Sequence, residues 1–197
     1  MKKIIGLTGE IGAGKDTFCQ YVKENYQNVF VFRFSDALTE ILKMFFDAVK
    51  RADQQWLGSS LKERFGDDIL VRALIRKVNK IDEGIIILNG VRANGEAEAI
   101  KENGGKIIYI TAEQKTRWER VCVRKEKSDD DVPYEKFMEM EKASAELPIP
   151  KIGAAADFRI ENNDSAELFY EEIKKLMESF DNKKLWKKAI IRENLLL

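Results

Sequence analysis

The sequence contains no histidine among its 197 residues. Imidazole general bases, Ser-His-Asp triads and histidine-ligated zinc are therefore excluded. Carboxylates must carry any acid–base chemistry, and lysine and arginine must carry any binding of anions.

Cysteine, long apolar runs and an excess of one charge are also lacking. Cys19 and Cys122 are isolated and have neither zinc-ligand spacing nor the density of a disulfide scaffold, so we expect a reducing, cytoplasmic environment. No apolar run could span a bilayer, and the N-terminal apolar stretch is too short for a signal peptide, so no membrane partner is expected. Lys plus Arg and Asp plus Glu number 34 each, so nucleic acid is not an expected partner either. The length suits one domain, as a monomer or a homodimer.

A glycine-rich segment lies between a strand pattern and a helix pattern near the N-terminus. The apolar run 4–7 precedes it, and Phe18, Tyr21 and Val22 follow it at helical spacing. Backbone N–H groups of such a loop converge on an oligophosphate, and a lysine adds a full positive charge. The residues expected to hold the phosphates are Gly9, Glu10, Ile11, Gly12, Ala13, Gly14, Lys15, Asp16 and Thr17. The alternative is a glycine-rich turn with an exposed lysine.

This loop departs from the usual phosphate-loop pattern at one position. Asp16 stands where a Ser or Thr normally offers its hydroxyl to magnesium, and Thr17 comes one residue later. The third expected strand ends in Asn89, where a second acidic motif usually holds Mg²⁺ through water. We hypothesise that Asp16 supplies the missing carboxylate, and that Asp16, Thr17 and Asn89 form the metal site.

Apolar segments typical of strands alternate with helical patterns along the chain. This alternation predicts an α/β fold with five parallel strands between layers of helices, and ligands at the carboxyl ends of the strands. The expected strands are residues 4–8, 29–34, 84–89, 106–111 and 157–161.

A helical segment is expected between the second and third strands, at about residues 37–80. Ser35 or Asp36 could cap a helix over 37–50; Asp36 could equally orient or deprotonate an acceptor. The pattern then continues to residue 80 with interruptions at Gly58 and Gly66. Its basic residues fit either a solvated face or a clamp on an acceptor.

Arginines follow the third and fourth strands. Arg92 is expected to bind phosphate, or to form a surface ion pair with Glu96. Arg120 and Arg124 share one helical face. That face fits a lid that closes over a transferring phosphoryl group, or a charged surface. The polar residues 126–131 suit a lid tip, within a lid at about 115–147.

The last third of the domain ends in an amphipathic helix and a basic tail. The expected helix covers 165–180 and should pack on the sheet. Asn162 and Asn163 before it fit either adenine contacts or a simple turn. The domain is expected to end at about residue 182, followed by an amphipathic basic tail over 183–197. The tail could dock on the core, pair with another subunit or touch an anionic surface.

Several segments resemble known families of P-loop kinases. The resemblance to phage-type deoxynucleoside monophosphate kinases rests on the segments GLTGEIGAGKDT, FSDALTEIL, SSLKERFGDD and ILNGVRANGEAEAIKENGGKIIYI. The later part, with Arg120-x3-Arg124 and ADFRIENNDS, is similar to dephospho-CoA kinases. It departs from both families at Asn89, where they usually carry Asp, and lacks the Asp-Ala-Asp typical of dephospho-CoA kinases after the second strand.

The resemblance implies a three-layer P-loop NTPase fold and an ATP- and Mg²⁺-dependent phosphotransferase. Asp36 and Arg92 would meet the acceptor, Arg120 and Arg124 would serve the lid, and Asn162 would lie near the adenine. The expected acceptor is a small nucleotide-like molecule, a (deoxy)nucleoside monophosphate first and dephospho-CoA second. A nucleotide-binding regulator with weak or no kinase activity is the alternative from another class. A nucleic-acid motor is disfavoured, because no strand-binding surface is evident.

Overall fold

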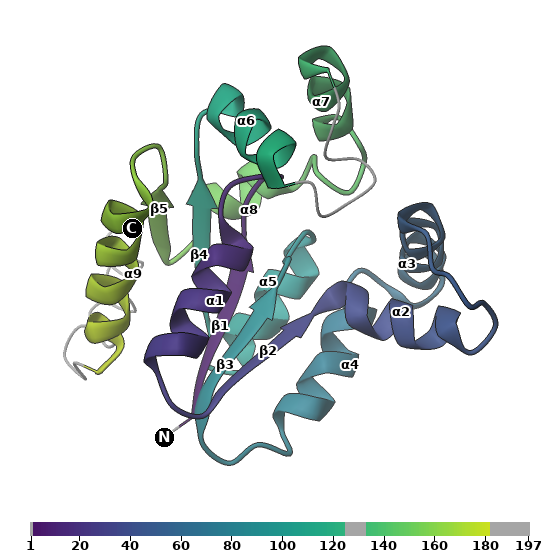
Figure 1. The fold of residues 1–197 in the computed structure, drawn as a ribbon. Coiled ribbons are helices and arrows are strands. Elements are labelled where there is room, and N and C mark those ends of the chain that lie inside the picture. Colours follow the sequence, from purple (N-terminus) through teal and green to yellow (C-terminus); the bar gives the residue numbers. More distant parts are fainter. Residues whose placement is uncertain (1, 125–132, 182–197) are drawn as a thin grey trace, which may run out of the picture.

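Five parallel strands form a single sheet in the order β2-β3-β1-β4-β5 (Figure 1). The computed structural model describes residues 2–124 and 133–181. The predicted lid tip at 126–131 and the predicted tail at 183–197 lie outside these residues. The strands are β1 (Lys2–Thr8), β2 (Val29–Arg33), β3 (Gly84–Asn89), β4 (Lys106–Thr111) and β5 (Phe158–Glu161). The expected parallel five-stranded sheet is confirmed, with strand boundaries within two residues of those predicted.

Helices connect successive strands and cover both faces of this sheet. They are α1 (Lys15–Asn25), α2 (Phe34–Lys43), α3 (Arg51–Phe65), α4 (Ile69–Val78), α5 (Asn94–Glu102), α6 (Gln114–Arg124), α7 (Tyr134–Glu141), α8 (Ile149–Ala154) and α9 (Ala166–Asp181). In the parts of the chain that are described, none of them is long and apolar enough to cross a membrane.

The core is divided into two layers by the alternation of side chains along the strands. In β1 and β3, Ile5 and Ile87 face α1 and α9, whereas Ile4 and Ile86 face α4, α5 and α8. Successive side chains of a strand point to opposite faces, so a strand that is apolar throughout serves both layers. This explains why β3 carries four consecutive apolar residues and is buried on both sides.

The helix after β2 differs from its predicted boundaries of 37–50. It begins at Phe34, because β2 ends at Arg33, and it ends at Lys43. Asp36 therefore lies in the first turn of α2 instead of before it, and its carboxylate accepts a hydrogen bond from the backbone N–H of Arg33 at 3.2 Å.

Gly58 does not interrupt the helical segment, contrary to the sequence-based expectation. It lies inside α3, where a Cβ atom would come within 3.2 Å of Leu38 Cδ1 on α2. Glycine here allows the two helices to approach closely. Gly66, by contrast, ends α3 with a φ of +94°, which side-chain-bearing residues rarely adopt.

Helices lie around the carboxyl edge of the sheet at both of its ends (Figure 1). Figure 1 shows α2 and α3 on one side of this edge and α6 and α7 on the other. The division into a core, an acceptor-binding insertion over 37–80 and a lid over 115–147 stays a prediction.

Candidate functional site

The glycine-rich loop connects β1 to α1 at the carboxyl edge of the sheet. Gly9, Gly12 and Gly14 all have positive φ values, of 152°, 78° and 107°. The Lys15 ammonium group donates hydrogen bonds to the carbonyl oxygens of Gly9 at 2.6 Å and Glu10 at 2.8 Å. The lysine thus lies over the loop, in the geometry of a phosphate-binding loop rather than of an exposed turn.

The environment of Lys15 lowers the pKa of its ammonium group. Burial and then the nearby Arg92 guanidinium lower its pKa from 10.5 to about 8, although Glu146, Asp16 and Glu10 act in the opposite direction. A second cation therefore lies within electrostatic reach of the loop lysine. An anion bound between Lys15 and Arg92 would relieve their repulsion.

Asp16 and Asn89 are brought together as the sequence predicts. The Asn89 amide donates to Asp16 Oδ1 at 2.9 Å, and Arg33 Nη2 donates to the same oxygen at 3.0 Å. Asn89 is buried, whereas Asp16 and Thr17 are exposed at the start of α1. Arg33 was not among the predicted site residues.

These residues fit a magnesium ion that is bound together with a nucleotide. Within the described residues, no group of three His, Cys, Asp or Glu side chains could hold a metal by itself. One carboxylate, an amide oxygen and a hydroxyl nevertheless suit Mg²⁺, which is usually held by one or two carboxylates, substrate phosphates and water. Asp16, Asn89 and Thr17 provide those groups.

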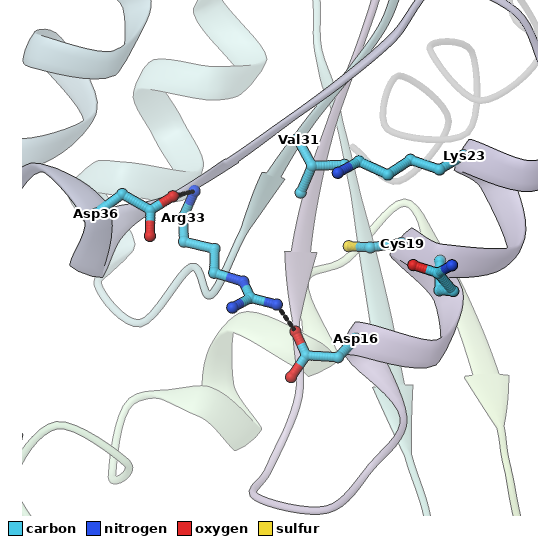
Figure 2. Close-up of a pocket in the computed structure, with 7 residues that line it drawn as sticks. Asp16, Cys19, Lys23, Val31, Arg33 and Asp36 are labelled. Carbon is cyan, nitrogen blue, oxygen red and sulfur yellow. Dashed lines mark hydrogen bonds and ion pairs between the residues drawn. The ribbon is translucent and has the colours of Figure 1, made fainter. Parts of the chain in front are cut away.

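A polar pocket of about 300 Å³ lies beside this cluster. Figure 2 shows Arg33 and Asp36 on one side of it and Asp16, Cys19 and Lys23, all on α1, on the other. Asp36 thus shares a pocket with Asp16 while its carboxylate caps α2. Burial, and next the nearby Asp16, raise the pKa of the Cys19 thiol to about 12, so this cysteine is not a nucleophile at neutral pH.

Arg92 does not form the expected side-chain ion pair with Glu96. Its Nη1 atom lies 2.6 Å from Glu146 Oε1 instead. Glu96 accepts hydrogen bonds from the backbone N–H groups of Arg92 and Ala93, and its other oxygen pairs with Lys62 at 2.8 Å. Glu96 therefore caps α5 and does not pair with the Arg92 guanidinium group, which lies beside Glu146.

Arg120 on α6 contacts Asn162, which directly follows β5. Arg120 donates to the backbone oxygen of Asn162 at 2.7 Å and of Asp164 at 3.3 Å, and burial lowers its pKa. The Asn162 amide donates to the backbone oxygen of Ala13 at 2.9 Å. These contacts tie the loop after β5 to α6 and to the phosphate loop. The side chain of Arg124 lies outside the described structure.

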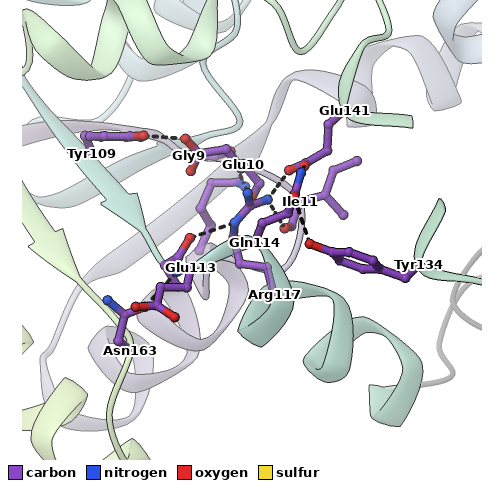
Figure 3. A network of polar contacts seen from close by, with 12 residues as sticks. Gly9, Glu10, Ile11, Tyr109, Glu113, Gln114, Arg117, Tyr134, Glu141 and Asn163 are labelled. Atoms are coloured by element: carbon purple, nitrogen blue, oxygen red, sulfur yellow. Dashed lines mark hydrogen bonds and ion pairs between the residues drawn. The ribbon is translucent and has the colours of Figure 1, made fainter. Parts of the chain in front are cut away.

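A buried polar network above the loop contains residues whose roles the sequence does not reveal. Arg117 donates to the backbone oxygen of Ile11 at 3.2 Å and pairs with Glu141, and Tyr109 donates to Glu10 (Figure 3). Arg117 lies on α6 with the expected lid arginines Arg120 and Arg124, yet it is 6% exposed. Helical spacing does not distinguish a buried arginine from a solvated one.

The fold and the loop define a P-loop protein with a kinase-like fold. A shikimate kinase from Bacteroides thetaiotaomicron superposes with a TM-score of 0.58 at 18% identity, covering 91% of this chain and 98% of its own. A dephospho-CoA kinase from Campylobacter jejuni superposes with a TM-score of 0.52 at 18% identity, covering 93% and 100%. At these identities the likeness shows the fold alone, and it confirms the predicted P-loop fold.

The chain belongs to the AAA_18 family, described as an AAA domain, whose model matches residues 5–146. A UPF0200 protein of Saccharolobus islandicus is 26% identical over 188 residues, which cover 93% of this chain and 94% of the relative. A UPF0200 protein of Sulfurisphaera tokodaii is 29% identical over 176 residues, which cover 89% and 96%. These relatives are not specifically phage-type deoxynucleoside monophosphate kinases, so that finer resemblance stays a prediction.

Proposed function

We propose that this protein is an ATP- and Mg²⁺-dependent kinase that transfers the γ-phosphoryl group to a small nucleotide-like acceptor. One observation carries the proposal. The phosphate loop holds Lys15 within electrostatic reach of Arg92, which follows the adjacent strand β3. Two cations at the carboxyl ends of neighbouring strands suit a donor phosphate and an acceptor phosphate that must approach each other.

The side chains divide into a donor group and an acceptor group. Backbone N–H groups of residues 9–14 and the Lys15 ammonium bind the ATP phosphates, and Arg120 with Asn162 lies toward the adenine. Bound Mg²⁺, held through Asp16, Thr17 and Asn89, supplies charge neutralisation at the phosphates. Arg92 orients the acceptor, and Arg124 joins from the lid. Asp36 is the carboxylate available to an acceptor hydroxyl.

The transfer itself requires little covalent chemistry from the protein. An oxygen of the acceptor bonds to the γ-phosphorus as the bond to the β–γ bridging oxygen breaks, and ADP leaves. An acceptor monophosphate attacks through an oxygen that is already ionised near pH 7. An acceptor hydroxyl passes its proton to a carboxylate such as Asp36.

The preferred acceptors are (deoxy)nucleoside monophosphates, and dephospho-CoA is the second candidate. The superposition with a dephospho-CoA kinase supports considering the latter, but the fold does not determine the acceptor. A nucleotide-binding regulator is favoured by a different observation. Asn89 is uncharged, and Glu146 already neutralises Arg92.

A screen of ADP release tests these alternatives. Wild-type protein and Lys15→Ala are assayed with ATP, Mg²⁺ and each nucleoside monophosphate or dephospho-CoA. We expect at least one acceptor to stimulate ADP release by wild type and not by the variant. If no acceptor raises release above the level of Lys15→Ala, the kinase proposal is wrong, and ATP binding without turnover then supports a regulator.

A further inference from the structure

A second pocket, of about 240 Å³, shares no lining residue with the pocket beside Asp16. We name it the acidic pocket, and its lining residues are Glu10, Arg117, Glu141, Glu146, Leu147 and Pro150. Ligand pockets for whole drug-sized molecules start at roughly 300 Å³. The acidic pocket therefore suits one part of a small molecule.

Arg117, the only cation among the described residues that line this pocket, is committed to other partners. Its guanidinium group pairs with Glu141 and donates to the backbone oxygens of Ala112 at 2.9 Å and Ile11 at 3.2 Å. It therefore neutralises Glu141, and Arg92, which does not line the pocket, pairs with Glu146. The lining itself still carries three carboxylates and one guanidinium group. The pocket consequently disfavours a phosphate group by charge repulsion.

Glu10 and Glu146 present buried oxygens to which no residue in the described part of the chain donates a well-aligned hydrogen bond. Glu10 Oε1 accepts from Tyr109, but no described residue donates to Glu10 Oε2. Glu146 is 6% exposed, and neither of its oxygens receives a well-aligned hydrogen bond from a described residue, although Arg92 lies 2.6 Å from Oε1. A buried carboxylate without donors is costly, so such groups normally face a donor.

We infer that the acidic pocket binds a hydrogen-bond-donating part of the acceptor, and that Glu146, with Glu10, determines acceptor specificity. The inference rests on the proposed function, because Arg92 would bridge the acceptor phosphate and the Glu146 carboxylate. The recognised chemistry is an N–H or O–H group on the molecule that carries the phosphate. An exocyclic amine of a base and a sugar hydroxyl both provide it. A site built to hydrogen-bond such a donor rejects an analogue that lacks it.

Matched pairs of nucleoside monophosphates test the inference by binding, without any need for turnover. CMP and UMP differ in an exocyclic amine donor, and CMP and dCMP differ in the 2′-hydroxyl. Dissociation constants are measured by calorimetry for wild type, Glu146→Gln, Glu10→Gln and the control Glu139→Gln. Glu139 is an exposed carboxylate on α7, so its variant has the same change of charge outside the pocket.

We expect wild type to bind CMP at least about tenfold more tightly than UMP, dCMP or both, since a charge-assisted hydrogen bond contributes on that order. A preference over UMP identifies the amine, and a preference over dCMP identifies the hydroxyl. Glu146→Gln should reduce the preference to less than about threefold, and Glu139→Gln should keep it. Glu10→Gln should weaken it, and this second variant replaces Glu146→Gln if that protein fails to fold.

Equal binding of both pairs by wild type, or no binding, overturns the inference. So does a preference that survives in both pocket variants. These results are separate from the fate of the kinase proposal. If the protein binds selectively but releases no ADP, the inference about the acidic pocket stands and the kinase proposal is wrong. If an acceptor stimulates ADP release but binding is not selective, the kinase proposal stands and the inference about the pocket is wrong.

Discussion

At the scale of single residues, the protonation of Lys15 links nucleotide affinity to pH. Its pKa of about 8 is set by burial and by Arg92. Bound phosphates favour the charged form and raise this pKa, so binding above pH 8 must include uptake of a proton. ATP phosphates are already ionised in this range, since a phosphate's last pKa is about 6. We expect the Kd for ATP to be constant from pH 7 to 7.5 and to rise by up to about tenfold per unit above pH 8.

Calorimetric titrations with ATP from pH 7 to 9.5 check this pH dependence, and Lys15→Arg is the matched control. Arginine stays protonated throughout this range, so the variant should show no rise in Kd, whatever its absolute affinity. A wild-type Kd that does not change between pH 8 and 9.5 would contradict the prediction. In the protein without ATP, raising the pH has a favourable effect on folding stability, whereas it weakens ATP binding. The unfolded chain binds more protons at Lys15 between pH 8 and 10.5, so this group's contribution to stability improves as pH rises through that window.

The Asp16 carboxylate should control the magnesium requirement, and Arg33 should compete with Mg²⁺ for that carboxylate. Asp16→Asn should raise the Mg²⁺ concentration for half-maximal ADP release by about tenfold or more, on the scale of lost metal-site interactions. Arg33→Ala should lower that concentration by no more than about fivefold, because an exposed ion pair contributes at most about 1 kcal/mol. The Arg33–Asp16 pair is half exposed and 3.0 Å long.

Magnesium titrations of acceptor-dependent ADP release provide the measurement. Glu24→Gln is the control, since Glu24 is an exposed carboxylate on the same helix. If Asp16→Ser has the same magnesium requirement as wild type, then Asp16 does not supply the carboxylate that is missing at Asn89.

Residue identity alone could predict part of the site and not the rest. Lys15, Asp16 and Asn89 were predictable because each occupies a fixed place in a strand–loop–helix motif or at the end of a strand. Glu146 and Glu141 were not, because they lie in helical or turn segments more than 100 residues from the loop that they approach. In sequence, such glutamates resemble those of a solvated surface.

At the scale of secondary-structure elements, the loop after β5 should stabilise the phosphate loop. Asn162 is 6% exposed and donates to Ala13 at 2.9 Å, so Asn162→Ala leaves a buried carbonyl without its partner. We expect a loss of about 1–3 kcal/mol in the free energy of unfolding, together with weaker ATP binding. Urea denaturation and calorimetry measure the two effects. Asp164→Asn, an exposed neighbour, should change neither, and an unchanged stability in Asn162→Ala would refute the role of this link.

The strands were more predictable than the helices. A buried parallel strand such as β3 requires a continuous apolar run, so its sequence defines its ends. The start of α2 depends on where β2 stops, and that end is set by its pairing with β3. Asp36 could be predicted as a local cap, but not its place in the first turn of the helix. Gly58 suggested a break by its propensity, but close packing against Leu38 accounts for it.

At the scale of the whole molecule, the phosphate loop joins the layers of the fold. It receives Asn162 from the segment between β5 and α9, Arg117 from α6 and Asn89 from β3. A ligand that binds this loop should therefore stabilise the folded protein as a unit. At 100 times its Kd, ATP with Mg²⁺ should add about 2.7 kcal/mol, which for a domain of this size raises Tm by roughly 5–10 °C. Differential scanning calorimetry measures this shift. Lys15→Ala should show little of it at the same concentration, and an equal shift in the variant would mean that ATP stabilises the protein from another site.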